Sequence, residues 1–471
     1  MEKHKPASFW DRALRNLRNA WSKIASDKDT SARIIVSPDL KDDDRLQLIN
    51  HMQACLDGTG GEVSARKRAA ELGHVYLSLS ENGRKKFLTI LASEFSTNPR
   101  LINTAIQELS RSEDAEGLFL AEKKLRDILV APRVELLKQF NGLPEGVKFL
   151  VDLRKELIPW ARYDITLKGL ENDLKMLLSS WFDVGFLELK QITWDAPASL
   201  LEKLIAYEAV HEIKDWEDLK NRLALDRRCF AYFHPRMPNE PLIFVWVALV
   251  EGIADDVHIL LDPEAPLGDP ETANAAIFYS ISNAQGGLTG INFGNFLIKR
   301  VVDSLSRDLP NIEIFATLSP VPGFNRWLDR CLDEETLDLI APKHTEILMS
   351  VSRKASPAAA LIDLLSREKW YLDDSLLDIL EEPLMKLCAY YLHHEKRDEC
   401  TAADSVAHFH LNNGARIERL NWLADLSPRG LKQSNGIMIN YLYDLKTIDS
   451  NHESYRAGDP LIISSEVRNL L

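Results

Sequence analysis

The sequence predicts an α+β protein in which an all-helical N-terminal domain, residues 1–186, precedes a mixed-sheet domain, residues 187–471. Up to residue 186 the apolar residues recur at helical spacing, and after it short runs rich in β-branched and aromatic residues appear. Between residues 275 and 318 a strand, a glycine loop, a helix and a second strand follow one another. This order predicts two parallel strands joined by a right-handed crossover.

The N-terminal domain is predicted as a helical bundle whose breaks carry the expected residues. The segment 57–61 (DGTGG) separates two helices, Pro132 and Pro144 suit first helical turns, and Asn141 with Gly142 suits a stop. No cluster of titratable residues stands out, so we interpret the bundle as support or subunit contact. The expected helices are 43–56, 63–79, 81–95, 100–112, 114–130, 132–140 and 144–156.

The second domain begins with strands. Residues 186–194 alternate like a strand, and 196–211 return to a helical pattern. The β-rich runs 228–234 and 242–250 are joined by the proline-containing turn 235–241, which predicts an antiparallel hairpin.

The segment 275–328 carries the first chemical signal. A strand at 275–282 enters a loop with four glycines, a helix follows, and a strand at 312–318 delivers Ser319 into the proline-rich turn 319–323. Glycines let a backbone approach a ligand, and a helix start favours an anion such as phosphate. A plain connecting turn explains the spacing equally well. The pattern matches neither a P-loop nor a dinucleotide-binding fingerprint.

The C-terminal part returns to helices, expected at 325–332, 335–339, 357–365 and 375–391. The run 404–414 (DSVAHFHLNNG) is predicted as a strand with His408 and His410 on one face. The segments 416–425 and 436–445 follow, the second with Tyr441 and Tyr443.

Composition excludes several classes. The net charge of −14 and the pI near 5.4 give no footprint of nucleic-acid binding. No run approaches the ~18 apolar residues of a membrane span. Five scattered cysteines without a CxxC pair indicate a reducing compartment, so we expect a cytoplasmic protein. The N-terminal apolar face of Trp10, Leu14 and Trp21 is interpreted as a helix or arm, with a targeting segment as the alternative, because acidic residues accompany it.

Three side chains are candidates for chemistry. Ser319 is a hydroxyl held in a proline-stiffened turn, although an ordinary turn serine is the commoner explanation. His410 can exchange a proton near neutral pH, whereas most strand histidines are structural. Tyr443 can donate to a reacting oxygen, or serve only in packing. The His and Cys residues of 388–410 match no familiar zinc spacing, so a metal site is not expected.

These segments together resemble the malonyl-CoA decarboxylase family. The matching strings are FYSISNAQGGLTGINFGNFLIKRVV, FATLSPVPGFNRWL, HFHLNNGARIERLNWLADLSPRGLKQSNGIMINYLYDL and, more modestly, RRCFAYFHPRMPNEPL, which together span residues 227–445. The resemblance implies a helical oligomerisation domain, which suggests a homodimer or homotetramer, and a catalytic domain of the GNAT acyltransferase fold. It also implies conversion of malonyl-CoA to acetyl-CoA and CO2 without metal or organic cofactor.

Residue by residue, the resemblance places the family's catalytic serine, histidine and tyrosine on Ser319, His410 and Tyr443. At Asn292 some members of the family carry a glutamate, so this chain lacks an ionisable group there. The acyl-CoA loop of GNAT enzymes is matched loosely. It implies CoA contacts from Gln285, Gly286, Gly287, Leu288, Thr289, Gly290 and Asn292.

The implied chemistry is the loss of CO2 to leave an enolate, which oxygen-directed donors stabilise and which takes a proton at carbon. His410 is expected to supply or relay that proton, and Ser319 to bind the departing carboxylate or orient the histidine. Two other functions stay open at this point: a GNAT-type transferase that hands the acyl group to an amine, and a non-catalytic acyl-CoA-binding protein.

Overall fold

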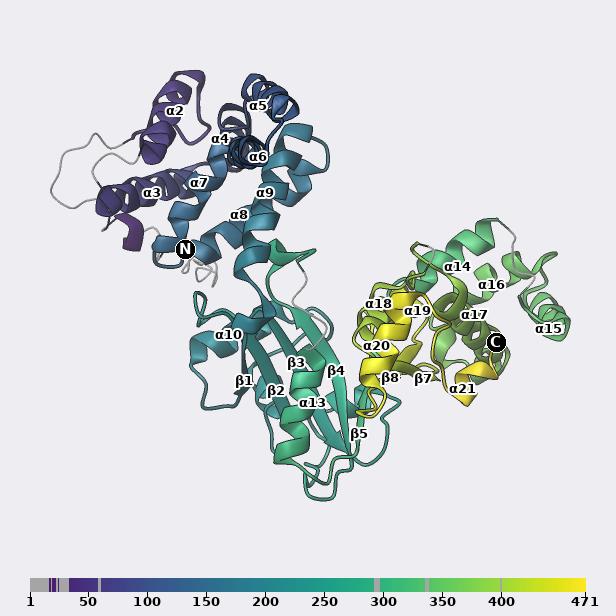
Figure 1. Ribbon diagram of the computed structural model, residues 1–471. Helices are drawn as coiled ribbons and strands as arrows, with labels where there is room; N and C mark the ends of the chain where they lie inside the picture. Colours follow the sequence, from purple (N-terminus) through teal and green to yellow (C-terminus); the bar gives the residue numbers. More distant parts are fainter. Residues whose placement is uncertain are drawn as a thin grey trace, which may run out of the picture. The chain divides into compact units, whose positions relative to one another are not determined.

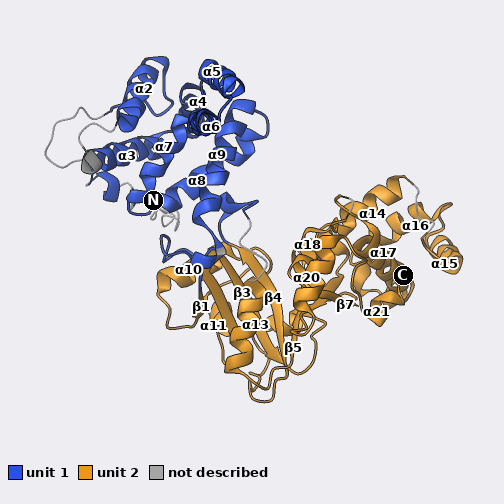
Figure 2. Cartoon of the chain, in the orientation of Figure 1, with its two compact units in different colours: residues 1–188, 233–242, 284–293 blue, residues 189–232, 243–283, 294–471 orange. Residues whose placement is uncertain are grey.

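The computed structural model describes residues 17, 19–22, 24, 34–57, 61–291, 297–334, 339–398 and 400–471. The chain divides into two compact units (Figure 2). The first contains Met1–Glu188, Phe233–Leu242 and Ala284–Phe293, and the second contains Leu189–Tyr232, Ile243–Asn283 and Gly294–Leu471. Two short segments that follow strands in the sequence therefore cluster with the N-terminal helices.

The first unit is helical, as predicted (Figure 1). Each predicted helix is present, with ends that differ by a few residues. An additional helix, α9, lies within the region expected to be helical. The elements are α2 (Asp42–Leu56), α3 (Gly61–Ser78), α4 (Glu81–Glu94), α5 (Pro99–Arg111), α6 (Ala115–Leu129), α7 (Pro132–Gln139), η1 (Phe140–Gly142), α8 (Gly146–Ala161), α9 (Ile165–Trp181), η2 (Val184–Phe186) and, from the later segment, η3 (Gly286–Leu288).

Local sequence explains where these helices begin. The side chains of Ser80 and Asp114 each accept a hydrogen bond from a backbone N–H of the first turn. The core of the unit is aromatic: Trp21 is fully buried, with its ring centroid 4.9 Å from that of Phe149. Trp10 and Leu14, which belong to the same predicted N-terminal face, lie outside the described residues.

The second unit contains a mixed sheet, which confirms the predicted fold class. The strand order is β1-β2-β3-β4-β5-β8-β6, and β7 pairs with β8. The predicted hairpin is present as antiparallel β2 and β3, and β4 and β5 are parallel, as the crossover rule predicts. The strands are β1 (Glu188–Ile192), β2 (Arg227–Phe233), β3 (Ile243–Val250), β4 (Ala275–Asn283), β5 (Ile314–Thr317), β6 (Ser319–Pro320), β7 (Arg416–Asn421) and β8 (Met438–Leu442).

Strand β4 extends beyond its parallel partner. Residues 275–278 pair with 314–317 of β5, and the chain then leaves β5 to form β6, which pairs with β8. In the described part of the chain, no strand pairs with residues 279–283 on that side, although β3 still pairs on the other. The sheet thus opens between the end of β4 and the turn that carries Ser319.

Helices complete the second unit. Helix α13 lies against the sheet (Figure 1). The Tyr232 hydroxyl of β2 donates to the carbonyl of Leu297 at the start of this helix. No helix in the described ranges is long and apolar enough to span a bilayer. The elements are α10 (Ala198–Tyr207), α11 (Trp216–Asn221), α12 (Val257–Leu261), α13 (Leu297–Asp308), α14 (Phe324–Asp333), α15 (Pro342–Ser352), α16 (Pro357–Leu365), η4 (Trp370–Leu372), α17 (Asp374–His394), α18 (Ser405–Asn412), α19 (Pro428–Ser434), α20 (Ile448–Ala457) and α21 (Ser465–Arg468).

The strand predicted at 404–414 is wrong, because these residues form helix α18. Asp404 caps the helix by accepting hydrogen bonds from the N–H groups of Val406 and Ala407. Residues two apart in a helix point in different directions, so His408 and His410 do not share a face. The helix expected at 335–339 falls largely on residues 335–338, outside the described residues.

Candidate active site

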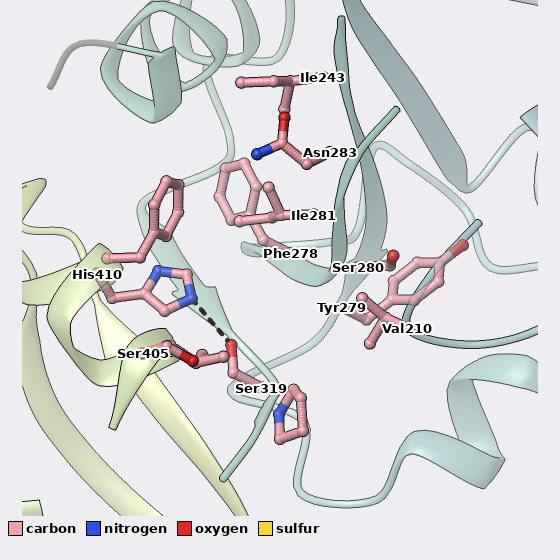
Figure 3. Close-up of a pocket in the computed structure, with 13 residues that line it drawn as sticks. Val210, Ile243, Phe278, Tyr279, Ser280, Ile281, Asn283, Ser319, Ser405 and His410 are labelled. Carbon is pink, nitrogen blue, oxygen red and sulfur yellow. Dashed lines mark hydrogen bonds between the residues drawn. The ribbon is translucent and has the colours of Figure 1, made fainter. Parts of the chain in front are cut away.

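A cavity of about 170 Å³ lies in the second unit where the sheet opens (Figure 3). The free end of β4 forms one wall, the start of β6 another, and helix α18 a third. The cavity is lined by Val210, Ile243, Phe278, Tyr279, Ser280, Ile281, Asn283, Ser319, Pro320, Ser405, Val406, Phe409 and His410.

Two of the three predicted catalytic side chains, Ser319 and His410, line this cavity, and Tyr443 is hydrogen-bonded to His410. The Oγ atom of Ser319 lies 3.2 Å from Nε2 of His410, a hydrogen bond marked by the dashed line in Figure 3. Nδ1 of His410 lies 2.7 Å from the hydroxyl oxygen of Tyr443. All three residues are buried. The structure therefore brings together, in one hydrogen-bonded chain, groups that are 91 and 33 residues apart in the sequence.

The direction of these hydrogen bonds follows from the donors present. Because the Ser319 hydroxyl donates to Thr317, it accepts from Nε2 of His410. Nδ1 of the neutral ring is left to accept from the hydroxyl of Tyr443, whose pKa burial raises well above its usual value. The imidazole then carries its own proton on Nε2, which faces Ser319. The serine in turn donates to Oγ1 of Thr317 at 2.9 Å. The N–H of Nε2 therefore points to Ser319 at the wall of the cavity.

His410 is neutral in this environment. Burial lowers its pKa to about 3, because no charged group in the described part of the chain offsets the cost of placing a cation there. The ring of Tyr441 stacks on the imidazole with centroids 4.5 Å apart and fixes its plane. At neutral pH the histidine is thus an oriented hydrogen-bond donor and not a cation.

Asp404 connects the two elements that carry Ser319 and His410. One carboxylate oxygen caps α18, and the other accepts a hydrogen bond from the backbone N–H of Gly323 at 3.0 Å and a longer one from Tyr391. A Cβ on Gly323 would lie 2.0 Å from the Tyr391 hydroxyl, so only glycine fits this contact. A single buried carboxylate thereby ties α18 to the turn that follows Ser319.

Glu208 holds the opposite wall. Its Oε1 atom accepts hydrogen bonds from the Ser280 hydroxyl and the Val210 N–H, both at 2.8 Å, and its Oε2 atom accepts one from the Trp246 indole. Ser280 and Val210 line the cavity. The carboxylate therefore anchors the segment after α10 to β3 and β4.

The predicted glycine loop lies in the first unit, packed against α8. A Cβ on Gly287 would lie 1.7 Å from the carbonyl oxygen of Val151, so the loop can approach the helix only with glycine there. Arg154 supports it by donating to the carbonyls of Gly287 and Thr289. The side chain of Gln285 is buried and donates to the carbonyl of Pro241. Close packing against α8 therefore explains at least one of the glycines in this loop, without any ligand.

Two lysines lie beside the loop. Atoms of the Lys155 side chain and Nζ of Lys175 each come to 3.5 Å from where a Cβ would stand on Gly286 and Gly290, respectively. Gly290 has a φ of +75°, which strains any other residue. Asn292, the remaining residue predicted to contact CoA, lies outside the described residues.

Sequence reasoning missed several residues of the site. Asp404 and Glu208 are positioned by contacts from distant segments. An aspartate before a helix is a recognisable N-cap, but the run that begins at Asp404 was predicted as a strand, so this role was missed. Ser405 and Asn283 also line the cavity, but neither was among the candidate residues, although both lie in segments that the sequence singled out. His408, considered beside His410, is instead bonded to the hydroxyl of Tyr455 at 2.8 Å, away from Ser319.

Comparison with known proteins identifies relatives along most of the chain. Residues 185–471 match the malonyl-CoA decarboxylase C-terminal domain, and residues 95–182 match the N-terminal domain of the same family. Mitochondrial malonyl-CoA decarboxylase of Anser anser anser is 38% identical over 419 residues, which cover 86% of this chain and 83% of that protein. Mitochondrial malonyl-CoA decarboxylase of Rattus norvegicus is 37% identical over 379 residues, which cover 78% of this chain and 76% of that protein.

Solved structures of the same family are similar to this chain. Malonyl-CoA decarboxylase from Rhodopseudomonas palustris is 39% identical, with a TM-score of 0.82 over 90% of this chain and 99% of that one. Malonyl-CoA decarboxylase from Agrobacterium vitis is 38% identical, with a TM-score of 0.81 over 90% of this chain and 99% of that one. The curated relatives correct one expectation: they are named mitochondrial, which contradicts the cytoplasmic location expected from the cysteine content.

Proposed function

The chain belongs to the malonyl-CoA decarboxylase family and acts as a carboxy-lyase on malonyl-CoA, and we propose that Ser319, His410 and Tyr443 carry out the reaction. The observation that carries this proposal is the hydrogen-bonded chain from Tyr443 through His410 to Ser319 at the wall of a cavity. Each link has a chemical role in breaking a carbon–carbon bond next to a thioester.

The free edge of β4 is proposed to align the substrate. Beyond Phe278 the described residues pair with β3 on one side only, so main-chain groups of 279–283 face the opening in the sheet. The pantetheine arm of CoA contains two amide groups that can pair with such an edge as a short strand would. This places the malonyl group next to Ser319 and His410.

Decarboxylation then proceeds through an enolate. The bond to the carboxyl carbon breaks, CO2 leaves, and the electron pair moves into the thioester to give an enolate oxygen. Without substrate the Ser319 hydroxyl donates to Thr317 and the Nε2 proton of His410 faces Ser319; when substrate binds, both donors turn to the enolate oxygen, and hydrogen bonds to the developing charge lower the barrier.

Protonation of the enolate carbon completes the reaction. His410 passes its Nε2 proton to the enolate carbon while Nδ1 takes the proton of the Tyr443 hydroxyl, so that the imidazole stays neutral. The phenolate left on Tyr443 regains a proton from solvent, because each turnover consumes one proton. Burial around His410 keeps the imidazole uncharged between turnovers.

The glycine loop is proposed to bind a phosphate of CoA. Its backbone turns tightly at Gly290, and the side chains of Lys155 and Lys175 lie alongside. Positive side chains beside a tightly turned backbone favour an anion. Gln285 to Gly290 would act as one unit, with Gln285 serving to position the backbone.

We also propose that the first unit joins copies of the chain. Helices α5 and α6 pack on each other and leave large apolar side chains in solvent: Leu101 and Ile106 on α5, and Leu118, Phe119 and Leu120 on α6, each more than two fifths exposed. Exposed apolar groups gathered in this way mark association surfaces.

The test of the function is a product assay. Malonyl-CoA incubated with the protein, and with no amine acceptor present, is expected to yield acetyl-CoA and CO2 in equal amounts. A transferase would release CoA only when an acceptor is added, and a binding protein would leave malonyl-CoA intact.

His410→Ala is expected to lower kcat on the order of 10²–10⁴-fold, the usual contribution of general acid–base catalysis, with a smaller change in KM. Steady-state kinetics on malonyl-CoA measures both constants. An unchanged kcat would remove His410 from the mechanism.

A further inference from the structure

A second cavity, of about 350 Å³, lies in the same unit beside the turn that follows Ser319. The start of α14, the hairpin after α17 and the start of α18 form its walls. Ser405 lines both this cavity and the one that contains His410. The second cavity therefore adjoins the catalytic pocket but contains different chemistry.

Three arginines line it. Arg326 and Arg330 lie one turn apart on α14, and Arg397 comes from the hairpin closed by the bridge between Lys396 and Ala402. All three are exposed, and none forms an ion pair with any described residue. Like charges at this helical spacing repel by roughly 0.2–0.5 kcal/mol. In a chain with a net charge of −14, such a concentration of positive charge indicates an anionic partner.

The acidic residue of the cavity wall forms no ion pair with these arginines. Asp404 is the carboxylate among the described lining residues, and both of its oxygens already accept hydrogen bonds, from α18 on one side and from Gly323 and Tyr391 on the other. Its role is to hold the two elements together. The guanidinium groups are thus available to a ligand.

Helix α14 adds to the positive potential. It is ten residues long, begins at the cavity with Gly323 as its N-cap, and has neither a capping side chain nor an acidic residue in its first turn. The partial positive charge of a helix N-terminus then reinforces the arginines.

We propose that this cavity binds a phosphate monoester. Guanidinium groups present paired N–H donors that match phosphate oxygens two at a time, and a dianion balances several of them better than a carboxylate does. The phosphate has two possible sources. One is the 3′-phosphate of the CoA substrate, which rests on the function proposed above, and the other is a separate phosphorylated metabolite that acts on the Asp404-linked turn.

Binding is tested first without substrate. Inorganic phosphate and adenosine 3′,5′-bisphosphate are titrated by calorimetry into the full chain, into Arg326→Ala and Arg397→Ala, and into a control, Arg307→Ala, an exposed arginine in the last turn of α13. The first two substitutions are expected to weaken binding by about tenfold or more, as each removes about 1.4 kcal/mol of charge-assisted hydrogen bonding, while the control is unchanged. Equal binding by all four proteins, or none by the wild type, would overturn the proposal.

Kinetics distinguish the two sources. If the site holds the 3′-phosphate of CoA, malonyl-dephospho-CoA raises KM about tenfold in the wild type but has little further effect in Arg326→Ala. If the ligand is a separate metabolite, removal of the 3′-phosphate affects both proteins equally, and added phosphate alters turnover of the wild type alone. The phosphate titrations do not depend on decarboxylation, so the failure of one proposal does not entail the failure of the other.

Discussion

At the scale of single residues, the neutral state of His410 determines what the pocket can do. A cationic histidine next to a malonyl carboxylate would bind the substrate tightly in its ground state, and such binding does not lower the barrier. A neutral imidazole that donates from Nε2 interacts more strongly with the enolate, in which the charge develops. In the proposed mechanism, burial, which lowers the pKa of His410 to about 3, therefore favours the transition state over the bound substrate.

Tyr443 sets the direction of the hydrogen-bonded chain, and Tyr443→Phe tests this. Without the phenol, Nδ1 of His410 loses its donor, and the ring can place its proton there and turn Nε2 into an acceptor. We expect kcat to fall on the order of 10–100-fold with a smaller change in KM. Steady-state kinetics of Tyr443→Phe, Ser319→Ala and the double variant measure the coupling. Because both side chains act through one imidazole, the losses should not add; strictly additive losses would contradict the chain.

The buried imidazole also makes stability depend on pH. The pKa of His410 is about 3 in the folded protein and ~6.5 when unfolded, so below pH 6.5 the unfolded chain binds a proton that the folded one does not. This contribution to stability is fully present above pH 6.5 and falls as the pH drops towards 3. Between pH 7 and pH 5 the loss is about 2 kcal/mol.

His410→Asn lacks that contribution. Urea unfolding of the wild type and the variant at pH 7 and pH 5 is expected to show that the wild type loses about 2 kcal/mol more than the variant does. The same difference between the two proteins at both pH values would mean that the folded imidazole titrates normally.

At the scale of elements, Asp404 keeps α18 and the turn after Ser319 in register. Asp404→Asn replaces an oxygen that accepts from Gly323 and Tyr391 with an amide group that cannot accept. Because small displacements of reacting groups cost large factors in rate, we expect kcat to fall on the order of 10-fold or more while KM changes little.

A matched control separates positioning from general loss of stability. Tyr391→Phe removes only the long 3.4 Å hydrogen bond to Asp404 and keeps its backbone contacts. This variant should lose less than about 3-fold in kcat, and thermal melting of both variants measures the structural cost. Equal effects of the two substitutions on kcat would show that the bond between Asp404 and Gly323 does not position the pair.

Helix α18 also shows what the sequence could and could not predict. The run 404–414 alternates apolar and polar residues over a short stretch, and the strand prediction rested on that alternation. The capping geometry of Asp404 and the burial of Ala407 and Leu411 on one helical face determine the actual structure. Ser319, His410 and Tyr443 could be selected from family motifs, but the contacts of Glu208 and Asp404 could not, since they join segments far apart in the chain.

At the scale of the whole molecule, the order of helices and strands along the sequence was enough to predict how strands pair, but not which segments cluster into each compact unit. The parallel pairing of β4 with β5 follows from the strand–helix–strand order. The clustering of residues 284–293 with the N-terminal helices does not, because it depends on contacts such as that of Gly287 with Val151. Cysteine content likewise indicates only a reducing environment, and the mitochondrial relatives show that this is too coarse to assign a compartment.

The assembly of the whole molecule is tested at α6. Phe119 is 63% exposed, and if this surface joins copies of the chain, Phe119→Glu places a charge in an apolar interface and should dissociate the oligomer. Sedimentation velocity of the wild type and the variant measures this, with a fall towards the mass of one chain, 53.5 kDa, expected for the variant. Ile259→Glu is the control, because Ile259 is similarly exposed, at 64%, but lies on α12 in the second unit. A wild type that sediments as a monomer, or an oligomer that Phe119→Glu leaves intact, would rule out this surface.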